Sequence, residues 1–250
     1  MSNGVVVVLG MGEVGQPLFQ ILSRTFDCVA VDIKPLEISA PCDVLHICYP
    51  FQMPDFAGTT AAYVKKYDPR LTVIHSTVAP GTTRKIQAVL PGRALIYSPV
   101  RGKHARMEAD MMRYKKFVAG FDPKAVEAAE RHFRQAGLQT DTFPTPDIAE
   151  LSKLLETTYF GVLIGWAQEV ERLAAQYDGS YDDVVSFIKE VDFLPSHIFP
   201  GVIGGHCVMP NIAILRQHLK SDFLEAVVNS NQAKTKMATT ELKLEPTLND

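Results

Sequence analysis

One cysteine stands where its thiol is favoured as a nucleophile. Cys207 ends the loop Pro200-Gly-Val-Ile-Gly-Gly-His206-Cys207, just before a helix expected to begin near Pro210. A helix N-terminus and a neighbouring imidazolium such as His206 both favour the thiolate, which is the form of cysteine that attacks carbonyl carbon. A small buried side chain without chemistry is the alternative for any single cysteine. The pattern favours a reactive thiol at Cys207.

A second motif has the spacing of a phosphate-binding loop. Three glycines with the pattern GxGxxG lie between an apolar run at residues 5–9 and a helical pattern, where they permit a tight turn and close approach of a pyrophosphate. Asp32 ends the next apolar run, where its carboxylate would bind ribose hydroxyls and repel the 2'-phosphate of NADP, although Lys34 follows closely. We therefore expect NAD as cofactor, held by Gly10, Met11, Gly12, Glu13, Val14, Gly15 and Asp32.

A dense basic loop, Arg101-Gly-Lys103-His104, follows a predicted strand at 94–98. Arg101, Lys103 and His104 are suited to a carboxylate or phosphate of a substrate, through charge-assisted hydrogen bonds. A solvated turn is the equal alternative. The other histidines have no metal-ligand spacing, and the four cysteines form no CxxC pair, so we expect no metal.

Two kinds of element must position these residues. Apolar runs at 5–9, 28–32, 43–49, 71–75, 94–98 and 116–120 alternate with loops or helical stretches, which predicts an α/β Rossmann domain with a mostly parallel sheet at 1–145. From Pro146 the spacing is helical as far as Ala175, and shorter helices follow at 181–191 and after Pro210. We expect an all-helical substrate and dimerisation domain at 146–240, built on the long helix, and a polar tail at 241–250.

Composition limits the classes of partner. The 250 residues are 46% hydrophobic with a net charge of -3, which suits a well-packed globular protein and gives no general attraction to nucleic acid or anionic membranes. The first residues contain neither a signal sequence nor a membrane span, so a cytoplasmic protein is expected. Apolar positions along the helix from Ile148 to Ala175 predict a homodimer.

Three further segments resemble the nucleotide-sugar 6-dehydrogenases, the UDP-glucose and UDP-N-acetylmannosamine dehydrogenase group, and more distantly the β-hydroxyacid dehydrogenases. They are Ser76-Thr77-Val-Ala-Pro-Gly-Thr-Thr83, Ala149-Glu-Leu-Ser-Lys153-Leu154 and the loop that ends at Cys207. The resemblance implies that Cys207 attacks an aldehyde to form a thiohemiacetal, which a second hydride transfer converts to a thioester. It also implies that Lys153 is a general acid/base or oxyanion stabiliser and that Thr77 positions water or a substrate hydroxyl near the nicotinamide. Solvated or capping roles are the alternatives for both.

The sequence departs from that family at three positions. Thr157 stands where the family has asparagine, Asn211 where it has aspartate, and Val100 where it has the glutamate of Ser-Pro-Glu. The two lost acids help to activate the hydrolytic water, so the thioester step has the least support. We still expect Thr157, His206 and Asn211 to contact the substrate. The family's third domain is expected to have no counterpart here, which leaves the substrate open.

Three functions remain for comparison. The first is an NAD-dependent dehydrogenase that oxidises an alcohol of a sugar or sugar-acid derivative, with Cys207 and Lys153 at the reacting carbon. The second is a two-electron β-hydroxyacid-type dehydrogenase on a small anionic substrate, in which Lys153 transfers the proton and Cys207 has no role. The third is an NAD-binding protein without catalysis, which Val100, Thr157 and Asn211 would explain.

Overall fold

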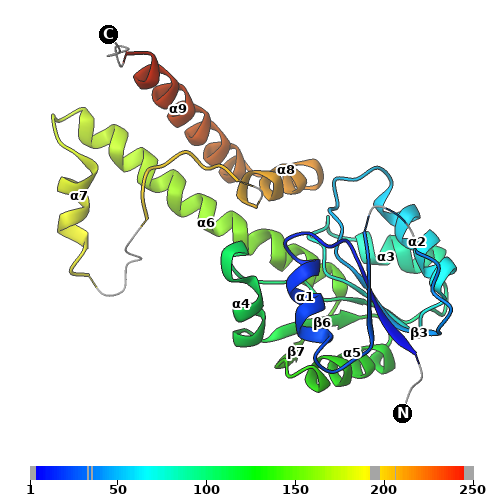
Figure 1. Cartoon of the computed structure of the whole chain (residues 1–250). Helices are drawn as coiled ribbons and strands as arrows, with labels where there is room; N and C mark the ends of the chain where they lie inside the picture. Colours follow the sequence, from blue (N-terminus) through cyan, green and yellow to red (C-terminus); the bar gives the residue numbers. More distant parts are fainter. Residues whose placement is uncertain (1–3, 33, 35, 192–197, 206, 245–250) are drawn as a thin grey trace, which may run out of the picture. The chain divides into compact units, whose positions relative to one another are not determined.

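The computed structural model describes residues 4–32, 34, 36–191, 198–205 and 207–244, with side chains as far as residue 239 (Figure 1). The chain divides into two compact units, residues 1–153 and 154–250. The expected boundary at residue 145 coincides with the start of the long helix, whereas the division between the units falls inside that helix. Among the described residues, no helix combines the length and the apolar character needed to cross a membrane.

The first unit is built on a seven-stranded sheet in the order β2-β1-β3-β4-β5-β6-β7. All neighbouring strands are parallel except β5 and β6, which are antiparallel. The strands are β1 (Val5–Leu9), β2 (Cys28–Val31), β3 (Cys42–Ile47), β4 (Leu71–Ile74), β5 (Leu95–Tyr97), β6 (Lys116–Gly120) and β7 (Thr140–Thr142). The predicted Rossmann architecture is confirmed.

Helices cover both faces of this sheet, as expected for strands that are apolar on both sides (Figure 1). One face packs Val5, Val7 and Leu9 of β1 with α2 and α3. The other face packs Val6 and Val8 with α1, α4 and α5. The helices of the unit are α1 (Gly15–Leu22), α2 (Phe56–Tyr67), α3 (Thr82–Val89), the 3-10 helix η1 (His104–Arg106), α4 (Met107–Arg113) and α5 (Pro123–Gln135).

The antiparallel strand changes what lies at the edge of the sheet. The chain leaves β1, β3, β4 and β5 at a common edge, because these strands run in the same direction. Since β6 runs the opposite way, its first residue, Lys116, comes to that same edge. The carboxyl edge therefore collects the glycine loop, Thr77, the start of the basic loop and Lys116.

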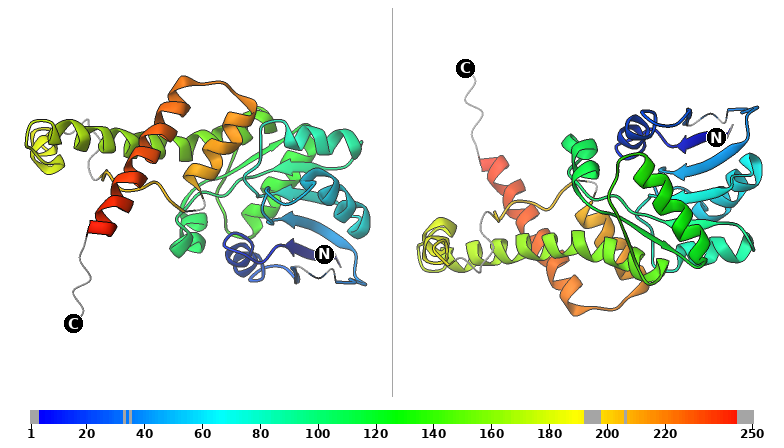
Figure 2. Two further views of the ribbon diagram at one scale, coloured as in Figure 1. Left: turned by 90° about the horizontal axis from the view of Figure 1, so that it is seen from above. Right: turned by 90° about the horizontal axis from the view of Figure 1, so that it is seen from below.

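The second unit is helical. It comprises the part of α6 (Pro146–Ala175) from Leu154 onward, α7 (Tyr181–Ile188), α8 (Val208–His218) and α9 (Asp222–Leu244). Both views of Figure 2 show α9 crossing α6. A glycine allows close packing there: a Cβ at Gly161 would lie 2.6 Å from Cγ1 of Val208 and 3.8 Å from Cγ1 of Val227.

The sequence predicted the long helix correctly, since α6 ends at Ala175 as expected. Three details differ. β7 was not predicted; α8 begins at Val208 rather than near Pro210; and α9 continues to Leu244, so residues 241–244 are helical and not tail. Residues 245–250 of the expected tail lie outside the described residues.

Candidate active site

The glycine loop has the geometry that a dinucleotide requires. Gly10 adopts φ +90°, and a Cβ at this position would lie 2.7 Å from the backbone nitrogen of Tyr49. A Cβ at Gly15 would lie 1.7 Å from the carbonyl oxygen of Gly10, so the turn closes only with glycine. A Cβ at Gly12 would meet nothing within 4 Å, which leaves open space beside the first turn of α1. Backbone N–H groups at a helix start favour a phosphate in such a space.

The acidic residue of the motif lies where the sequence predicted it. Asp32 follows the last residue of β2 and its side chain is exposed. Glu13, within the loop, forms an ion pair with His104, whose Nδ1 lies 2.9 Å from Oε2 of the carboxylate. The glycine loop and the basic loop therefore meet through the contact between Glu13 and His104.

A buried carboxylate joins the Thr77 loop to the start of α6. Glu150 is fully buried and accepts hydrogen bonds from Gly81 N at 2.6 Å, Thr83 N at 2.8 Å and Thr83 Oγ1 at 2.6 Å. Burial raises the pKa of Glu150, while these three donors act in the opposite direction. Lys153 lies one turn further along the same helix and is half-buried. Glu150 thereby fixes the helical turn that carries Lys153 against the segment that follows Thr77.

The basic loop is packed more firmly than a solvated turn would be. The Arg101 guanidinium donates a hydrogen bond to the carbonyl of Lys115 at 2.8 Å and lies 4.8 Å from the centre of the Phe117 ring. The backbone of Lys103 donates to the buried carboxylate of Asp110 at 2.9 Å, and the Lys103 side chain is exposed. Arg101 is thus held at the edge of the sheet while Lys103 faces solvent.

In the second unit, Cys207 occupies the N-cap position of α8 and is half-buried. Its carbonyl accepts the hydrogen bond of Asn211 N at 3.1 Å, which closes the first turn. A thiol at this place lies beside the positive end of the helix dipole, the environment that stabilises a thiolate. Cys207 thus lies at the start of the helix that follows it, and a role as nucleophile stays a prediction; His206, the other predicted influence on the thiol, lies outside the described residues.

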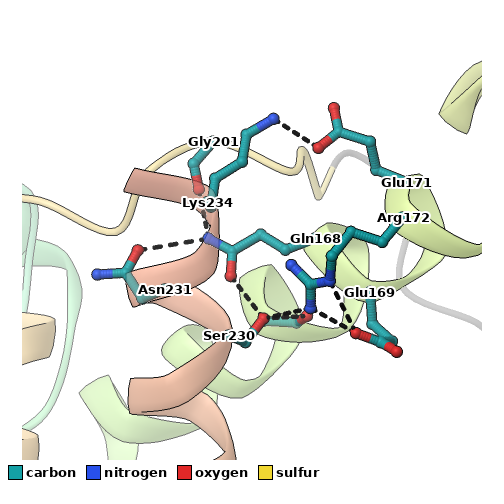
Figure 3. Close-up of polar contacts among 9 residues, drawn as sticks. Gln168, Glu169, Glu171, Arg172, Gly201, Ser230, Asn231 and Lys234 are labelled. Carbon is teal, nitrogen blue, oxygen red and sulfur yellow. Dashed lines mark hydrogen bonds and ion pairs between the residues drawn. The ribbon is translucent and has the colours of Figure 1, made fainter. Parts of the chain in front are cut away.

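Buried amides hold the glycine-rich segment that leads to Cys207 (Figure 3). The Asn231 side chain pairs with Ile203 through both of its polar atoms: Oδ1 accepts from Ile203 N at 2.7 Å, and Nδ2 donates to Ile203 O at 3.1 Å. Gln168, fully buried on α6, donates to Gly201 O at 2.6 Å. These contacts tie the segment to α9 and α6. Neither contact could be predicted from the sequence, because each amide lies within an ordinary amphipathic helix.

Thr157 and Asn211, two of the residues that differ from the family pattern, form a hydrogen bond with each other. Asn211 Nδ2 donates to Thr157 Oγ1 at 2.7 Å, and the Thr157 hydroxyl donates to Leu154 O at 3.0 Å. Asn211 is buried. The third departure, Val100, is buried in the apolar core with α4 and α5. Thr157 and Asn211 therefore form a matched pair, and Val100 contributes packing.

The structure thus assembles the predicted residues in two groups. Gly10–Gly15, Asp32, Thr77, Arg101, Lys103, His104 and Lys153 belong to the first unit, whereas Thr157, Cys207 and Asn211 belong to the second. The sequence did not predict the roles of Glu150, Gln168 and Asn231, which hold these segments in place. Glu150 nevertheless lies within residues 149–154, one of the segments that carry the family resemblance.

Comparisons with known proteins agree with the motifs. Residues 147–233 match the model of the UDP-glucose/GDP-mannose dehydrogenase family, central domain. A UDP-N-acetyl-D-mannosamine dehydrogenase of Pyrococcus horikoshii is 27% identical over 163 residues, which cover 61% of this chain and 39% of that protein. One from Methanocaldococcus jannaschii is 24% identical over 269 residues, covering 83% of this chain and 61% of that protein. The resemblance to nucleotide-sugar dehydrogenases is confirmed.

Solved structures give the same fold. The UDP-D-ManNAc dehydrogenase of Pyrococcus horikoshii aligns with a TM-score of 0.81 at 21% identity, covering 96% of this chain and 70% of that one. A 3-hydroxyisobutyrate dehydrogenase of Mycobacterium tuberculosis aligns with a TM-score of 0.66 at 15% identity, covering 96% and 94%. The match to the first curated relative extends over less than half of that relative's length.

Proposed function

We propose that this chain is an NAD-dependent dehydrogenase that oxidises an alcohol of a sugar or sugar-acid derivative, with nucleotide sugars as the first candidates. The observation that carries the proposal is the Cys207 segment. It matches the family's central domain and ends in a thiol at the N-cap of α8, on a loop held by buried amides. An inert surface cysteine would need none of these anchors.

The first unit supports the choice of cofactor. The open space at Gly12, the turn that only Gly10 and Gly15 allow, and the exposed carboxylate of Asp32 fit a pyrophosphate and an unphosphorylated ribose. When bound, NAD accepts the hydride that leaves the alcohol carbon. Binding and orientation of both molecules are the task of this chain's own residues.

Lys153 and Thr77 are the proposed groups for proton movement. Oxidation of an alcohol releases one proton from its hydroxyl, and the amine of half-buried Lys153 is the proposed acceptor of that proton. Thr77 would hold the hydroxyl through a hydrogen bond. If the product is an aldehyde, the Cys207 thiolate adds to its carbonyl carbon, and Lys153 stabilises the oxyanion that results.

The decisive experiment measures NADH formation with a panel of nucleotide sugars, sugar acids and small hydroxyacids. Lys153→Met should lower kcat by about 10²- to 10⁴-fold, the usual contribution of a general base. Lys65→Met, an exposed lysine near the end of α2, is the matched control and should leave kcat unchanged. NAD binding by calorimetry without turnover of any compound would favour a binding protein and reject the enzyme.

A second function has one observation in its favour. The chain covers nearly the whole length of the 3-hydroxyisobutyrate dehydrogenase structure, and Asn211 supplies no carboxylate for a hydrolytic step. A two-electron oxidation of a small hydroxyacid would need Lys153 but not Cys207. Full activity of Cys207→Ser on such a substrate, with none on nucleotide sugars, would establish this alternative.

A further inference from the structure

A chain of four ionisable side chains runs through the interior of the first unit. His46 Nδ1 lies 2.8 Å from His75 Nε2, and His46 Nε2 lies 3.0 Å from His132 Nε2. His75 Nδ1 lies 3.0 Å from Lys116 Nζ. All four residues are buried, although they come from β3, the end of β4, β6 and α5. The contacts are therefore continuous from the edge of the sheet to α5.

The lysine end of this chain lies beneath the segment that leads to the basic loop. Lys116 Nζ donates to Ser98 O at 2.6 Å and to Pro99 O at 3.0 Å. Together with His75 Nδ1, these two carbonyls give the ammonium three acceptors for its three hydrogens. At the opposite end, His132 stacks on the Phe26 ring with the ring centres 4.6 Å apart.

When the three histidines are neutral and the bonds between them all run in one direction, the chain has two arrangements of protons. If Lys116 is an ammonium, it donates to His75 Nδ1; His75 Nε2–H then donates to His46, and His46 Nε2–H donates to His132, which carries its own proton on Nδ1. If Lys116 is a neutral amine that has passed its proton to His75, every bond reverses: His132 Nε2–H donates to His46, His46 Nδ1–H to His75, and His75 Nδ1–H to Lys116 or to Ser98 O, 2.9 Å away.

We propose that Lys116, His75, His46 and His132 form a proton relay that links the underside of the Ser98–Arg101 segment to α5. The conversion is balanced. An Nζ–H bond of Lys116 breaks as Nδ1–H forms on His75; Nε2–H of His75 passes to His46 Nδ1, and Nε2–H of His46 passes to His132 Nε2. His132 then releases its Nδ1 proton to water, and no electrons are transferred.

Electrostatics place the working range of the relay near neutral pH. The pKa of Lys116 is lowered to about 7, chiefly by burial and also by the charges of Lys153 and Arg101, whereas Cys48 acts to raise it. Burial also lowers the pKa of His46 and His75, and it lowers that of His132 to about 4 against the opposing effect of Asp43. The histidines are therefore neutral when Lys116 titrates, and they carry its proton without holding the charge.

The relay gives Lys116 a positioning role. It lets solution pH set the charge of buried Lys116, which lies beside the carbonyl oxygens of Ser98 and Pro99. Because Arg101 is held at the same edge, this charge adds to the positive potential available for an anionic ligand. Lys116 acts through the segment and is not itself exposed.

The test is nitrogen-15 NMR of labelled histidine in the full chain between pH 6 and 8.5, because nitrogen shifts and couplings distinguish the tautomers. His75, His46 and His132 should change tautomer together, with one common midpoint near the lysine pKa. Lys116→Met should hold all three in the arrangement of the neutral amine at every pH. Lys115→Met removes the neighbouring exposed lysine and should preserve the joint transition.

A second variant protects the test against loss of folding in Lys116→Met. His46→Gln interrupts the middle of the chain, so His75 should still follow the lysine while His132 no longer does. Histidines that keep fixed tautomers over this range in the unmodified protein, or that change with separate midpoints, would overturn the relay. These readouts do not depend on enzyme activity, so the result stands apart from the proposed function.

Discussion

Asp32 is the residue on which the choice between NAD and NADP depends. Its exposed carboxylate at the end of β2 would accept hydrogen bonds from the ribose hydroxyls. Hydrogen bonds to charged groups contribute about 1.5–3 kcal/mol, so Asp32→Ala should weaken NAD binding by about 10-fold or more. Calorimetric titration with both cofactors measures this loss.

The variant should also bind NADP relatively better, since repulsion of its 2'-phosphate is removed. Asp27→Ala is the matched control, because Asp27 is an exposed carboxylate at the other end of the same strand. If Asp32→Ala retains the original preference, the ribose is recognised by other groups.

Cys207 and Asn211 together predict the number of electrons removed. A thiolate suffices to attack an aldehyde, but hydrolysis of the resulting thioester needs a base for the water, and an amide cannot accept that proton. Since the Asn211 amide nitrogen is already bonded to Thr157, we expect the reaction to stop after two electrons or to leave an acyl group on Cys207. Mass spectrometry of the quenched enzyme, with a count of NADH per substrate, detects either outcome.

Asn211→Asp should speed release of the acid by restoring a carboxylate, whereas Asn229→Asp on exposed α9 surface should not. Two NADH per substrate without a burst in the unmodified enzyme would mean that another group activates the water.

At the scale of elements, the segment that leads to Cys207 depends on Asn231, a buried residue of α9. Asn231→Ala would leave the buried N–H and C=O of Ile203 without their side-chain partner. An unsatisfied buried group costs about 1–3 kcal/mol, and we expect a loss of unfolding free energy in this range. Urea denaturation gives the loss, and hydrogen exchange at residues 201–205 should increase.

Asn229→Ala lies two residues earlier on the same helix and is exposed, so it should change neither quantity. Equal exchange in the two variants would show that the segment is held without the Asn231 amide.

The elements also show why the sequence predicted some features and missed others. The runs of β1, β3 and β4 are apolar on both faces, and α6 has a long helical period, so local pattern was sufficient for them. β7 is the short segment Thr-Asp-Thr, which has no apolar pattern, and it becomes a strand only by pairing with β6. The antiparallel direction of β6 is likewise a tertiary property. The position of Lys116 at the carboxyl edge of the sheet therefore could not be predicted.

In the candidate site, too, local motifs could be predicted and tertiary contacts could not. Motifs that depend on short spacing, such as Gly10–Gly15 with Asp32, were predictable because the strand–turn–helix that holds them is local. The pairing of Thr157 with Asn211 joins positions 54 residues apart, and no local pattern encodes it. Pairs of this kind need the packed structure.

At the scale of the whole molecule, α6 leaves aromatic surface uncovered. Tyr159 is 60% exposed, Phe160 51% and Trp166 61%, whereas Leu154, also expected on this surface, is buried. Exposed apolar patches of this kind favour association, and a symmetric homodimer through α6 would bury them. We expect a dimer at micromolar concentration by light scattering and a monomer for Trp166→Glu.

The control for this prediction is Phe187→Glu. Phe187 is an 87% exposed aromatic residue on α7, so its replacement tests the effect of lost apolar surface away from α6. A monomeric mass for the unmodified chain would reject the dimer. If both variants are monomeric, the interface is not confined to α6.

The close contact at Gly161 predicts a second-site suppressor at Val208. Its hydrogen faces Val208, the residue after Cys207, and a methyl group there would lie 2.6 Å from the valine. Gly161→Ala should therefore displace the start of α8, costing about 1–3 kcal/mol as overpacking does, with a matching loss of activity. A selection for restored activity should then recover Val208→Ala as a suppressor, because the valine gives up the volume that the alanine takes. We expect a larger side chain at position 161 to be tolerated only with a smaller one at position 208, so the sizes of the two residues should covary among related sequences.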